Sequence, residues 1–600
     1  MCGIYGYFDR GARPMTDAAL KAMSDSLIYR GPDDSGVARF DHGAIGNRRL
    51  SIIDIAGGHQ PMTAAEGKVA LVQNGEIYNY VELGAELRQS GWRPRTHSDT
   101  EVLLGLYLRD GPGFVRRLNG MFAIAVYDAR GPEPVLHLWR DRVGVKPLFV
   151  YEDGDRLLFG SEIKALLAGG APAEADKAAL HHFLTLNYVP PPLTAFQGIR
   201  HLPPGGHMKI TPRGAETDAW WRLADCGHQP WRGQEAGAQA EVLALLDDAV
   251  RLRLRADVPF GAFLSGGIDS STVVGLMSMH MERPVETFAI GFDDPRFDES
   301  AHAEAAARRF GASHHLDIVS PRMLDRWPRA LHHLDQPHGD VSFLPTLRVA
   351  ELAARQVKMV LTGDGGDELF AGYDKYVHAF VDMPEDMDEA GFRRRYFDRA
   401  LAMFPEGEAR RALYHPDFAA ETDGCSTFDL IEEHFEAAAH MDRVNQALYL
   451  DTALLLPGNN LVKPDRMAMA VSLEARTPFL DYRVVEHAFR LPGAMKLRNG
   501  ETKVVLKNTV RPLIGAALTD RRKQMFTVPV GEWFRTELAA YAREMLRGER
   551  FHDRRLFDRD AVELMLENHI QGSQNNTREI RALLALEHWH RIFIDGETPP

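Results

Sequence analysis

The sequence predicts an α+β domain of antiparallel sheets layered with helices, followed by an α/β doubly wound domain with a helical C-terminal annex. In the first ~200 residues, short apolar or alternating runs are punctuated by Gly, Asp, Asn and Pro, as in strands joined by tight turns. From about residue 238 an apolar strand, a polar Gly-rich turn and a helix recur, and from about residue 380 helical periodicity dominates. We therefore predict domains at residues 1–210 and 237–600, with 211–236 as a linker or closing hairpin.

The composition excludes several classes of protein. The 600 residues are 45% hydrophobic and 26% charged, which is ordinary for a globular chain. A formal net charge of −14 disfavours nucleic acid and anionic membrane surfaces, so we expect neither as a partner. The three cysteines form no disulfide framework and no CxxC zinc pair. Because no apolar run reaches ~18 residues and the N-terminus lacks the features of a signal peptide, we expect a cytoplasmic protein.

The individual elements follow from local patterns. Strands of the first domain are predicted in residues 2–8, 43–54, 68–79, 121–128, 135–141 and 148–153, with helices in 16–28 and 99–109. The Pro- and Gly-rich segment 187–207 is predicted to be a loop. In the second domain, apolar residues on one face predict a helix over 240–254, and VPFGAFL (258–264) predicts a buried strand.

The first candidate nucleophile is Cys2. If Met1 is removed, the thiol of Cys2 lies beside its own α-amine, whose reference pKa of ~8 suits a general base near neutral pH. A cysteine at this position is usually chance when it stands alone. Four polar motifs alter that reading, although each by itself is typical of a turn or a helix cap: RGPDDSG (30–36), RRLSIID (48–54), QNGEIYN (73–79) and HSDTE (97–101).

Together these motifs contain the groups that amide hydrolysis requires. The side-chain amide of Asn74 and the backbone N–H of Gly75 can form an oxyanion hole. Arg49 can bind an α-carboxylate, and Glu76 and Asp99 can bind an α-ammonium.

From Cys2 to about Phe159 the chain resembles the class II glutamine amidotransferases, which are N-terminal-nucleophile glutaminases. The resemblance rests on CGIYG, RGPDD, RRLSIID, QNGEIYN and MFAIAVYD in this order. It implies that Cys2 attacks the side-chain amide of L-glutamine, and that RLSII (49–53) follows the family's glutamine-binding strand. The glutamine-binding residues that it implies are Arg49, Leu50, Ser51, Ile52, Ile53, Asn74, Gly75, Glu76 and Asp99.

A second candidate site begins at SGGIDSS (265–271), which follows a predicted strand and opens a helix. Glycines and a helix N-terminus suit phosphate oxygens, but the absence of a following Lys excludes a P-loop. Asp269 offers a carboxylate to a magnesium ion. The unit resembles the pyrophosphate loop of ATP pyrophosphatases, while an ordinary Ser- and Gly-rich helix cap is the alternative reading.

Further charged residues follow along the chain. They are Asp364, Asp367 and Glu368 in LTGDGGDELFAGY (361–373), then Asp465, Arg466, Glu474 and Arg476 around a turn in 460–481, then Lys503, Lys507 and RRKQMF (521–526) as cations for phosphates. The adjacent pairs His314–His315 and His332–His333 lack a metal-binding context, so we interpret them as structural.

Behind the glutaminase motifs, these blocks resemble the glutamine-hydrolysing asparagine synthetases over nearly the whole chain. The resemblance implies that ATP is a substrate, that Asp269 and Asp367 bind Mg²⁺ and pyrophosphate, that Lys503 contacts phosphate, and that a homodimer can form. Asp364, expected to be catalytic in forming the acyl-adenylate, replaces the Glu of the better-known enzymes. The implied ATP and pyrophosphate residues are Leu264, Ser265, Gly266, Gly267, Asp269, Ser270, Ser271, Ile290, Thr362, Gly363 and Lys503.

The sequence thus predicts amidation of L-aspartate through aspartyl-AMP, with ammonia released from glutamine. Two alternatives stay open. The same machinery can act on another carboxylate, such as a sugar uronate, a peptide or an antibiotic precursor, because no motif defines the acceptor pocket. A non-catalytic regulator is the other, although intact Cys2 and SGGIDS argue against it.

Overall fold

The computed structural model describes residues 2–521 and 530–599, and its N-terminal third contains two antiparallel sheets. The first has the order β10-β8-β9-β1-β3-β2 and the second β12-β11-β7-β6-β5-β4. Their bounds are β1 Cys2–Asp9, β2 Asp34–Phe40, β3 Gly43–Arg49, β4 Met62–Ala64, β5 Val69–Ile77, β6 Gly120–Asp128, β7 Val135–Arg140, β8 Phe149–Asp153, β9 Arg156–Gly160, β10 Ile199–His201, β11 Gly206–Thr211 and β12 Gly214–Ala219.

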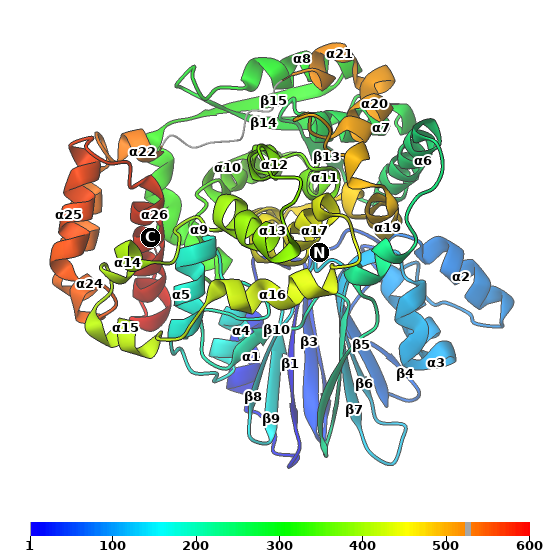
Figure 1. Cartoon of the computed structure of the whole chain (residues 1–600). Coiled ribbons are helices and arrows are strands. Elements are labelled where there is room, and N and C mark those ends of the chain that lie inside the picture. The colour runs from blue at the N-terminus through cyan, green and yellow to red at the C-terminus, as the bar shows by residue number, and fades with distance from the viewer. Residues whose placement is uncertain (1, 522–529, 600) are drawn as a thin grey trace.

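The two sheets pack face to face because their strands alternate inward and outward side chains. Ile4 and Phe8 of β1 meet Val72 of β5 in the apolar layer between the sheets, whereas Tyr5 and Tyr7 point outward. The outer faces are covered by helices, which gives four layers (Figure 1). Helices α1 Asp17–Asp25, α4 Ile163–Ala168 and α5 Lys177–Leu186 cover the first sheet, and α2 Tyr80–Gln89 and α3 Asp99–Asp110 cover the second.

The segment after residue 210 begins with a hairpin. Strand β12 pairs antiparallel with β11, which extends the second sheet to Ala219. Residues 211–219 therefore complete a hairpin, and residues 220–234 connect it to the next helix. A short helix, η2 Leu223–His228, then leads to the amphipathic helix α6 Glu235–Arg253, whose predicted apolar face is buried.

A five-stranded parallel sheet of order β15-β14-β13-β16-β17 forms the centre of the second half. Helices α6 and α7 pack on one face and α10 on the other, as expected for a doubly wound domain. The sheet contains β13 Phe260–Phe263, β14 Glu286–Phe292, β15 Ser313–Val319, β16 Met359–Leu361 and β17 Glu474–Arg476, and its helices are α7 Ile268–His280, α8 Ser300–Phe310, α9 Trp327–Leu334, α10 Phe343–Ala353 and α11 Gly366–Phe370.

The strand order places a ligand site at one point of this sheet. The chain runs outward from β13 to β14 and β15, then crosses back to β16 on the other side of β13. Open α/β sheets bind ligands where the strand order reverses, at the carboxyl ends of the strands. The loops 264–267 and 362–365 leave β13 and β16 at this point.

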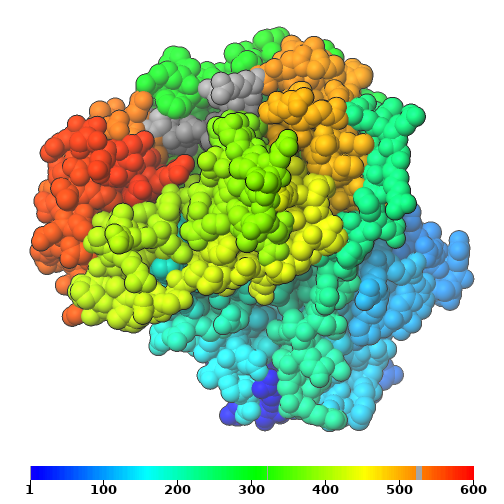
Figure 2. Space-filling view, in the orientation of Figure 1, coloured from blue at the N-terminus to red at the C-terminus, as the bar shows by residue number. Residues whose placement is uncertain are grey.

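The C-terminal annex is helical, as predicted. In Figure 2 its yellow-green and yellow segments cover the middle of the face above the blue and cyan sandwich. Among the helices that the structure describes, none combines the length and apolar character needed to cross a bilayer. The annex comprises α12 Asp374–Phe380, α13 Glu389–Tyr396, α14 Glu408–Arg411, α15 Pro416–Glu421, α16 Thr427–Ala437, α17 Arg443–Leu450, η5 Asp451–Asn460, α18 Val462–Met469, α19 Tyr482–Arg490, α20 Val504–Ile514, α21 Ala516–Thr519, α22 Val530–Trp533, α23 Ala539–Arg547, α24 Glu549–Asp553, α25 Arg559–Ile570 and α26 Thr577–Trp589.

Candidate active sites

Cys2 is the first residue of β1 and is 5% exposed. Its backbone N–H donates to Asn74 Oδ1 at 3.1 Å, and Arg30 Nε donates to its carbonyl oxygen at 3.1 Å. Burial raises the pKa of the Cys2 thiol, while hydrogen bonds from Asn47 and the Leu50 backbone oppose this rise. The resting group is therefore a neutral thiol, which requires a base before it can attack a carbonyl.

Asn74 and Gly75 lie on β5, at the edge of this strand that faces Cys2. The N–H groups of Gln73 and Ile77 both point to this edge, because they donate to Gln60 Oε1 at 2.7 Å and Asp99 Oδ2 at 3.1 Å. The alternation of a β-strand then directs the N–H of Gly75 to the same edge. A Cβ at Gly75 would lie 2.0 Å from Met121 O, so only glycine fits there.

Arg49 ends β3 and pairs in register with Cys2 across the sheet. Its guanidinium donates to the carbonyl oxygens of Ile53 and Asp54, both at 2.8 Å, and of Ile55 at 3.2 Å. Residues 50–53 were predicted within a strand, but the strand stops at Arg49 and Leu50, Ser51, Ile52 and Ile53 form a loop. This loop curls around the guanidinium because its carbonyl groups need donors that a strand partner would otherwise supply.

Two buried carboxylates face the same region. Asp99 Oδ2 accepts from Gln73 Nε2 at 2.8 Å, and burial raises the pKa of Asp99. Burial also raises the pKa of Glu76 well above its usual range, with further contributions from Glu474 and Asp99. A bound cation would relieve the repulsion between these carboxyl groups, which suits a substrate ammonium.

Two further neighbours of Cys2 were not predicted from the sequence. Asn47, on β3, hydrogen bonds the thiol and donates to Gln73 O at 3.1 Å. Ser161, directly after β9, accepts from Asn74 Nδ2 at 3.3 Å and from Ile4 N at 3.0 Å. Neither belongs to a recognisable local pattern, so only the folded sheet reveals them.

The second site forms at the carboxyl ends of β13 and β16. Lys503 Nζ lies 2.5 Å from Asp269 Oδ2 and 2.6 Å from Asp367 Oδ1. A Cβ at Gly372 would lie 1.9 Å from Asp367 Oδ1, so glycine permits this close approach. Two carboxylates that converge on one point are the oxygen donors that a magnesium ion prefers.

The remaining ATP residues predicted from the sequence are found around this point. Ser265 Oγ and Ser270 Oγ share a hydrogen bond of 3.1 Å in the turn that opens α7. Gly266 has φ +73° and approaches the backbone of His302 so closely that a Cβ would lie 2.5 Å from its carbonyl carbon. Gly267 is the N-cap of α7, Ser271 lies in its first turn, Leu264 follows β13, Ile290 lies near the end of β14, and Thr362 and Gly363 follow β16.

Asp364 and Glu368 have distinct surroundings. Asp364 Oδ2 accepts from Thr362 Oγ1 at 2.6 Å, and burial raises the pKa of Asp364. Glu368 Oε1 accepts from Tyr373 Oη at 2.7 Å and from Asn460 Nδ2 at 2.6 Å, and burial raises the pKa of Glu368 to about 7.

The other predicted cations are placed differently. Lys507 Nζ donates to Glu501 Oε1 at 3.2 Å. Arg521 donates to Gly266 O at 3.2 Å and forms an ion pair with Glu299. The rest of RRKQMF, residues 522–526, lies outside the described residues.

The charged residues of 460–481 connect the two halves of the chain instead of surrounding the phosphate loops. Asp465 pairs with Arg30 at 2.9 Å and with Lys146 at 3.1 Å. Arg466 pairs with Glu162 at 2.7 Å. Glu474 and Arg476 lie on β17, a strand too short for its pattern to show in the sequence.

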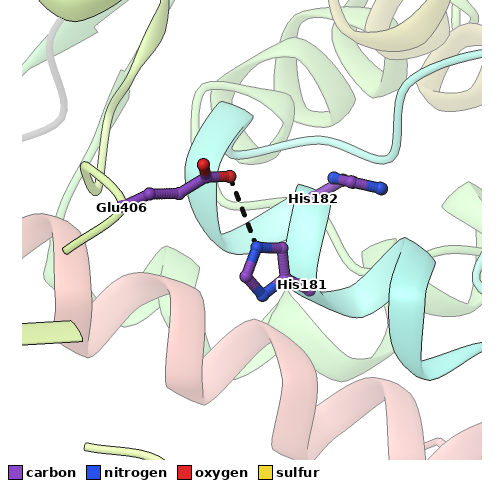
Figure 3. A group of neighbouring side chains, drawn as sticks. All are labelled: His181, His182 and Glu406. Atoms are coloured by element: carbon purple, nitrogen blue, oxygen red, sulfur yellow. Dashed lines mark hydrogen bonds and ion pairs between the residues drawn. The ribbon is translucent and has the colours of Figure 1, made fainter. Parts of the chain in front are cut away.

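The histidine pairs behave as structural residues where partners are seen, since His314 Nδ1 shares a hydrogen bond with Thr287 Oγ1 and His315 pairs with Glu286. A different group, His181, His182 and Glu406, brings possible metal ligands within 4.8 Å of one another in the described chain. Figure 3 shows His181 directed at Glu406. However, the buried Arg410 guanidinium donates to His181 Nε2 at 2.8 Å, so this cluster already contains a positive charge that the protein itself supplies.

Comparisons with known proteins identify a family for each half of the chain. A family model described as "Asparagine synthase" matches residues 241–591, and one described as "Glutamine amidotransferase domain" matches residues 1–221. "Asparagine synthetase [glutamine-hydrolyzing] 1" of Bacillus subtilis is 32% identical over 632 residues, covering 100% of this chain and 98% of that protein. A "Putative asparagine synthetase [glutamine-hydrolyzing]" of Mycobacterium tuberculosis is 34% identical over 650 residues, with coverages of 100% and 98%.

A more distant relative carries another name. "Amidase chyE" of Penicillium rubens is 28% identical over 615 residues, covering 89% of each chain. The synthase model spans more than half of the 600 residues, and the similarity to the Bacillus protein extends over the full length. The chain therefore belongs to the asparagine synthase family and carries a glutamine amidotransferase domain at its N-terminus.

Proposed function

We propose that the protein converts L-aspartate to L-asparagine, with ATP as the energy source and L-glutamine as the nitrogen donor. The observation that carries the proposal is the convergence of Asp269, Asp367 and Lys503 at the switch point of the parallel sheet, in a chain that also buries Cys2 beside Asn74. In the proposed division, residues 1–210 hydrolyse glutamine and residues 237–600 activate the acceptor. A cytoplasmic location stays a prediction.

Glutamine hydrolysis would begin at Cys2. After removal of Met1, the α-amine of Cys2 takes the thiol proton, and the thiolate attacks the glutamine side-chain amide. The developing oxyanion accepts hydrogen bonds from Asn74 Nδ2 and the N–H of Gly75, which the edge of β5 holds in place. Ammonia leaves, and water hydrolyses the thioester to release glutamate.

The second half-reaction forms and consumes an acyl-adenylate. The acceptor carboxylate attacks the α-phosphorus of ATP, and pyrophosphate leaves. Asp269 and Asp367 would hold a magnesium ion that screens the phosphate charge. Ammonia that has passed through the protein from the first site then attacks the adenylate, which yields the amide and AMP. Lys503 contributes a positive charge beside the departing pyrophosphate.

Two observations bear on the choice of acceptor. Full-length similarity to proteins named asparagine synthetase favours aspartate. Similarity to proteins named amidase, and Asp364 in place of the expected Glu, favour another carboxylate as the second candidate. A screen of ATP-dependent pyrophosphate release with L-aspartate, L-glutamate and small uronic acids tests the choice. Release with aspartate supports the proposal, whereas release with a uronic acid alone would replace it.

A further inference from the structure

The loop that surrounds the Arg49 guanidinium contains a strained turn at Asp54. This residue has a φ of +51°, in the left-handed region that few non-glycine residues occupy. Its own carboxylate supplies part of the restraint, because Oδ1 accepts from Gly57 N at 2.9 Å and Oδ2 accepts from His97 N at 2.8 Å. A strained residue persists only where its surroundings hold it, and such residues are frequent at binding sites.

A further restraint on this turn comes from the second half of the chain. Asp257, three residues before β13, contacts the loop twice. Its backbone N–H donates to Ile52 O at 2.9 Å, and its carboxylate Oδ2 accepts from Asp54 N at 2.8 Å. These two bonds flank Ile53, whose carbonyl oxygen accepts from the Arg49 guanidinium at 2.8 Å. Asp257 therefore fixes the stretch of backbone that orients this guanidinium.

Asp54 connects this contact to both charged ends of the proposed glutamine site. Its carbonyl oxygen accepts from the Arg49 guanidinium at 2.8 Å, on the side proposed for the α-carboxylate. Its carboxylate accepts from the N–H of His97, two residues before Asp99, on the side proposed for the α-ammonium. One turn is thus bonded to the supports of both groups.

The same segment of the second half contacts the opposite side of the site. Arg255 donates to Tyr78 O and forms an ion pair with Glu82 at 2.6 Å. Tyr78 directly follows β5, the strand that carries Asn74. Residues 255–257 therefore lie against both the loop that follows β3 and the segment that follows β5.

We infer that Asp54 and Asp257 are positioning residues for glutamine binding, so that the second half of the chain completes the glutamine site. The inference rests on the proposed function, since it takes Arg49 and Asp99 as groups that bind glutamine. Cys2 and the oxyanion donors are held by the sheet pairing of β1 and β5. The two positioning carboxylates therefore control the affinity for glutamine more than the rate of the chemical step.

Glutamine hydrolysis by the full-length chain tests Asp257. Asp257→Ala removes the acceptor for Asp54 N, and because Asp257 is exposed, water can replace part of this bond. We expect the KM for glutamine to rise about 3- to 10-fold, with kcat changed by less than about 2-fold. L-Glutamate keeps the α-carboxylate and α-ammonium of glutamine, so it should inhibit this variant correspondingly more weakly. Asp257→Asn retains an acceptor oxygen and should restore a near-native KM.

Asp54→Asn tests the turn itself. Asn tolerates the left-handed region, but it has one acceptor oxygen in place of two, so one of the bonds to Gly57 and His97 is lost. We expect the KM for glutamine to rise about 10-fold. In the double variant with Asp257→Ala, the rise should be smaller than the product of the two single effects, because both changes act on one turn.

Asp247→Ala is the matched control. Asp247 is a partly exposed carboxylate on α6, in the same half of the chain, and its Oδ1 contacts His280 Nε2 on α7 at 2.7 Å. Its removal should leave the KM for glutamine unchanged. Pyrophosphate release with ATP, magnesium, ammonium and the acceptor that the native chain uses shows whether each variant has folded, and it should stay near native in all of them.

The outcomes separate this inference from the proposed function. An unchanged KM for glutamine in Asp257→Ala would overturn the inference, and so would equal effects of the Ala and Asn substitutions. A parallel loss of glutamine hydrolysis and pyrophosphate release would also overturn it, because the residue would then support the fold in general. If the native chain does not hydrolyse glutamine, the proposed function itself fails, and the inference fails with it.

Discussion

Replacement of Asp269 by Asn tests the synthetase site most directly. Both carboxylate oxygens of Asp269 accept from Lys503 Nζ, at 2.7 and 2.5 Å, and Asp367 contacts the same ammonium at 2.6 Å. These three groups carry one net negative charge, which attracts a divalent cation. In the variant the group is neutral, and an amide N–H₂ can face the ammonium.

The size of the effect follows from these contacts. A hydrogen bond to a charged group contributes about 1.5–3 kcal/mol. A unit charge about 4 Å from another contributes about 4 kcal/mol at an effective dielectric constant of about 20. Since about 1.4 kcal/mol corresponds to a tenfold change in rate, we expect kcat/KM for pyrophosphate release to fall by roughly 10²-fold or more.

The assay compares the two half-reactions in one preparation. Pyrophosphate release is measured with ATP, magnesium, ammonium and L-aspartate, and glutamine hydrolysis is measured separately. Asp269→Asn should lose the first activity and keep the second, because Cys2 lies in the N-terminal sandwich. Asp417→Asn, which removes a surface ion pair with Arg555 on helix α15, is a matched control and should keep both activities. Near-native pyrophosphate release by Asp269→Asn would refute the assignment of this carboxylate.

Three further changes give separate tests. Cys2→Ala should abolish glutamine-dependent amide formation but retain ammonium-dependent formation, best above neutral pH. The amide product is measured with glutamine and with ammonium as nitrogen donors. Residual use of glutamine would exclude Cys2 as the nucleophile. Asp364→Glu should reduce synthesis by on the order of 10²-fold, because the added methylene displaces a carboxylate held by Thr362; unchanged kinetics would show that its position is not critical. Burial raises the pKa of Glu368 from 4.5 to about 7. Protonated Glu368 therefore contributes to the free energy of unfolding in full below about pH 4.5, and this contribution is lost as the pH rises through about 7. Glu368→Gln should therefore have little effect on unfolding free energy at pH 5 and stabilise the fold by on the order of 3 kcal/mol at pH 8; equal effects in denaturant melts at both pH values would contradict this reasoning.

The elements of the fold were largely predictable because they have strong local patterns. The runs 2–8, 68–79 and 121–128 all contain strands, and the predicted apolar face of residues 240–254 is buried in α6. The two Gly-rich turns that follow β13 and β16 also lie at the carboxyl ends of these strands, as predicted. Gly-rich turns at strand ends have few alternative positions in a parallel sheet.

The prediction was wrong where tertiary contacts override local pattern. RLSII alternates like a strand, yet the backbone leaves the sheet at Arg49 because the guanidinium binds the carbonyl groups of the following loop. Leu50 and Ile52 are buried in the loop, and so is the polar Ser51 between them, so the alternation corresponds neither to strand pairing nor to a solvent-facing side. Strand β17 has only three residues, which is too few for any periodicity.

The sequence offers candidate site residues as a list but does not show how they are arranged. Motif order selects Cys2, Asn74 and Asp269 as candidates, whereas Asn47 and Ser161 become visible only through their contacts.

The contact between the halves depends on paired charges, and Arg476 shows why this matters for function. Its backbone carbonyl accepts from Thr362 N at 2.9 Å, at the start of the loop that carries Asp364, and its guanidinium lies 3.7 Å from Glu76 Oε2. Arg476 keeps its ion pair with Glu474, 2.6 Å away on the same strand, so the ion pairs that a shift between the halves would break are those of Asp465 with Arg30 and of Arg466 with Glu162. A buried charge that loses its partner costs several kcal/mol. Apolar contacts would tolerate such a slide more readily because they are not directional. Arg476 therefore contacts both the proposed glutamine-binding edge and the loop that carries Asp364, and the ion pairs of Asp465 and Arg466 share in holding the two halves in one relative position.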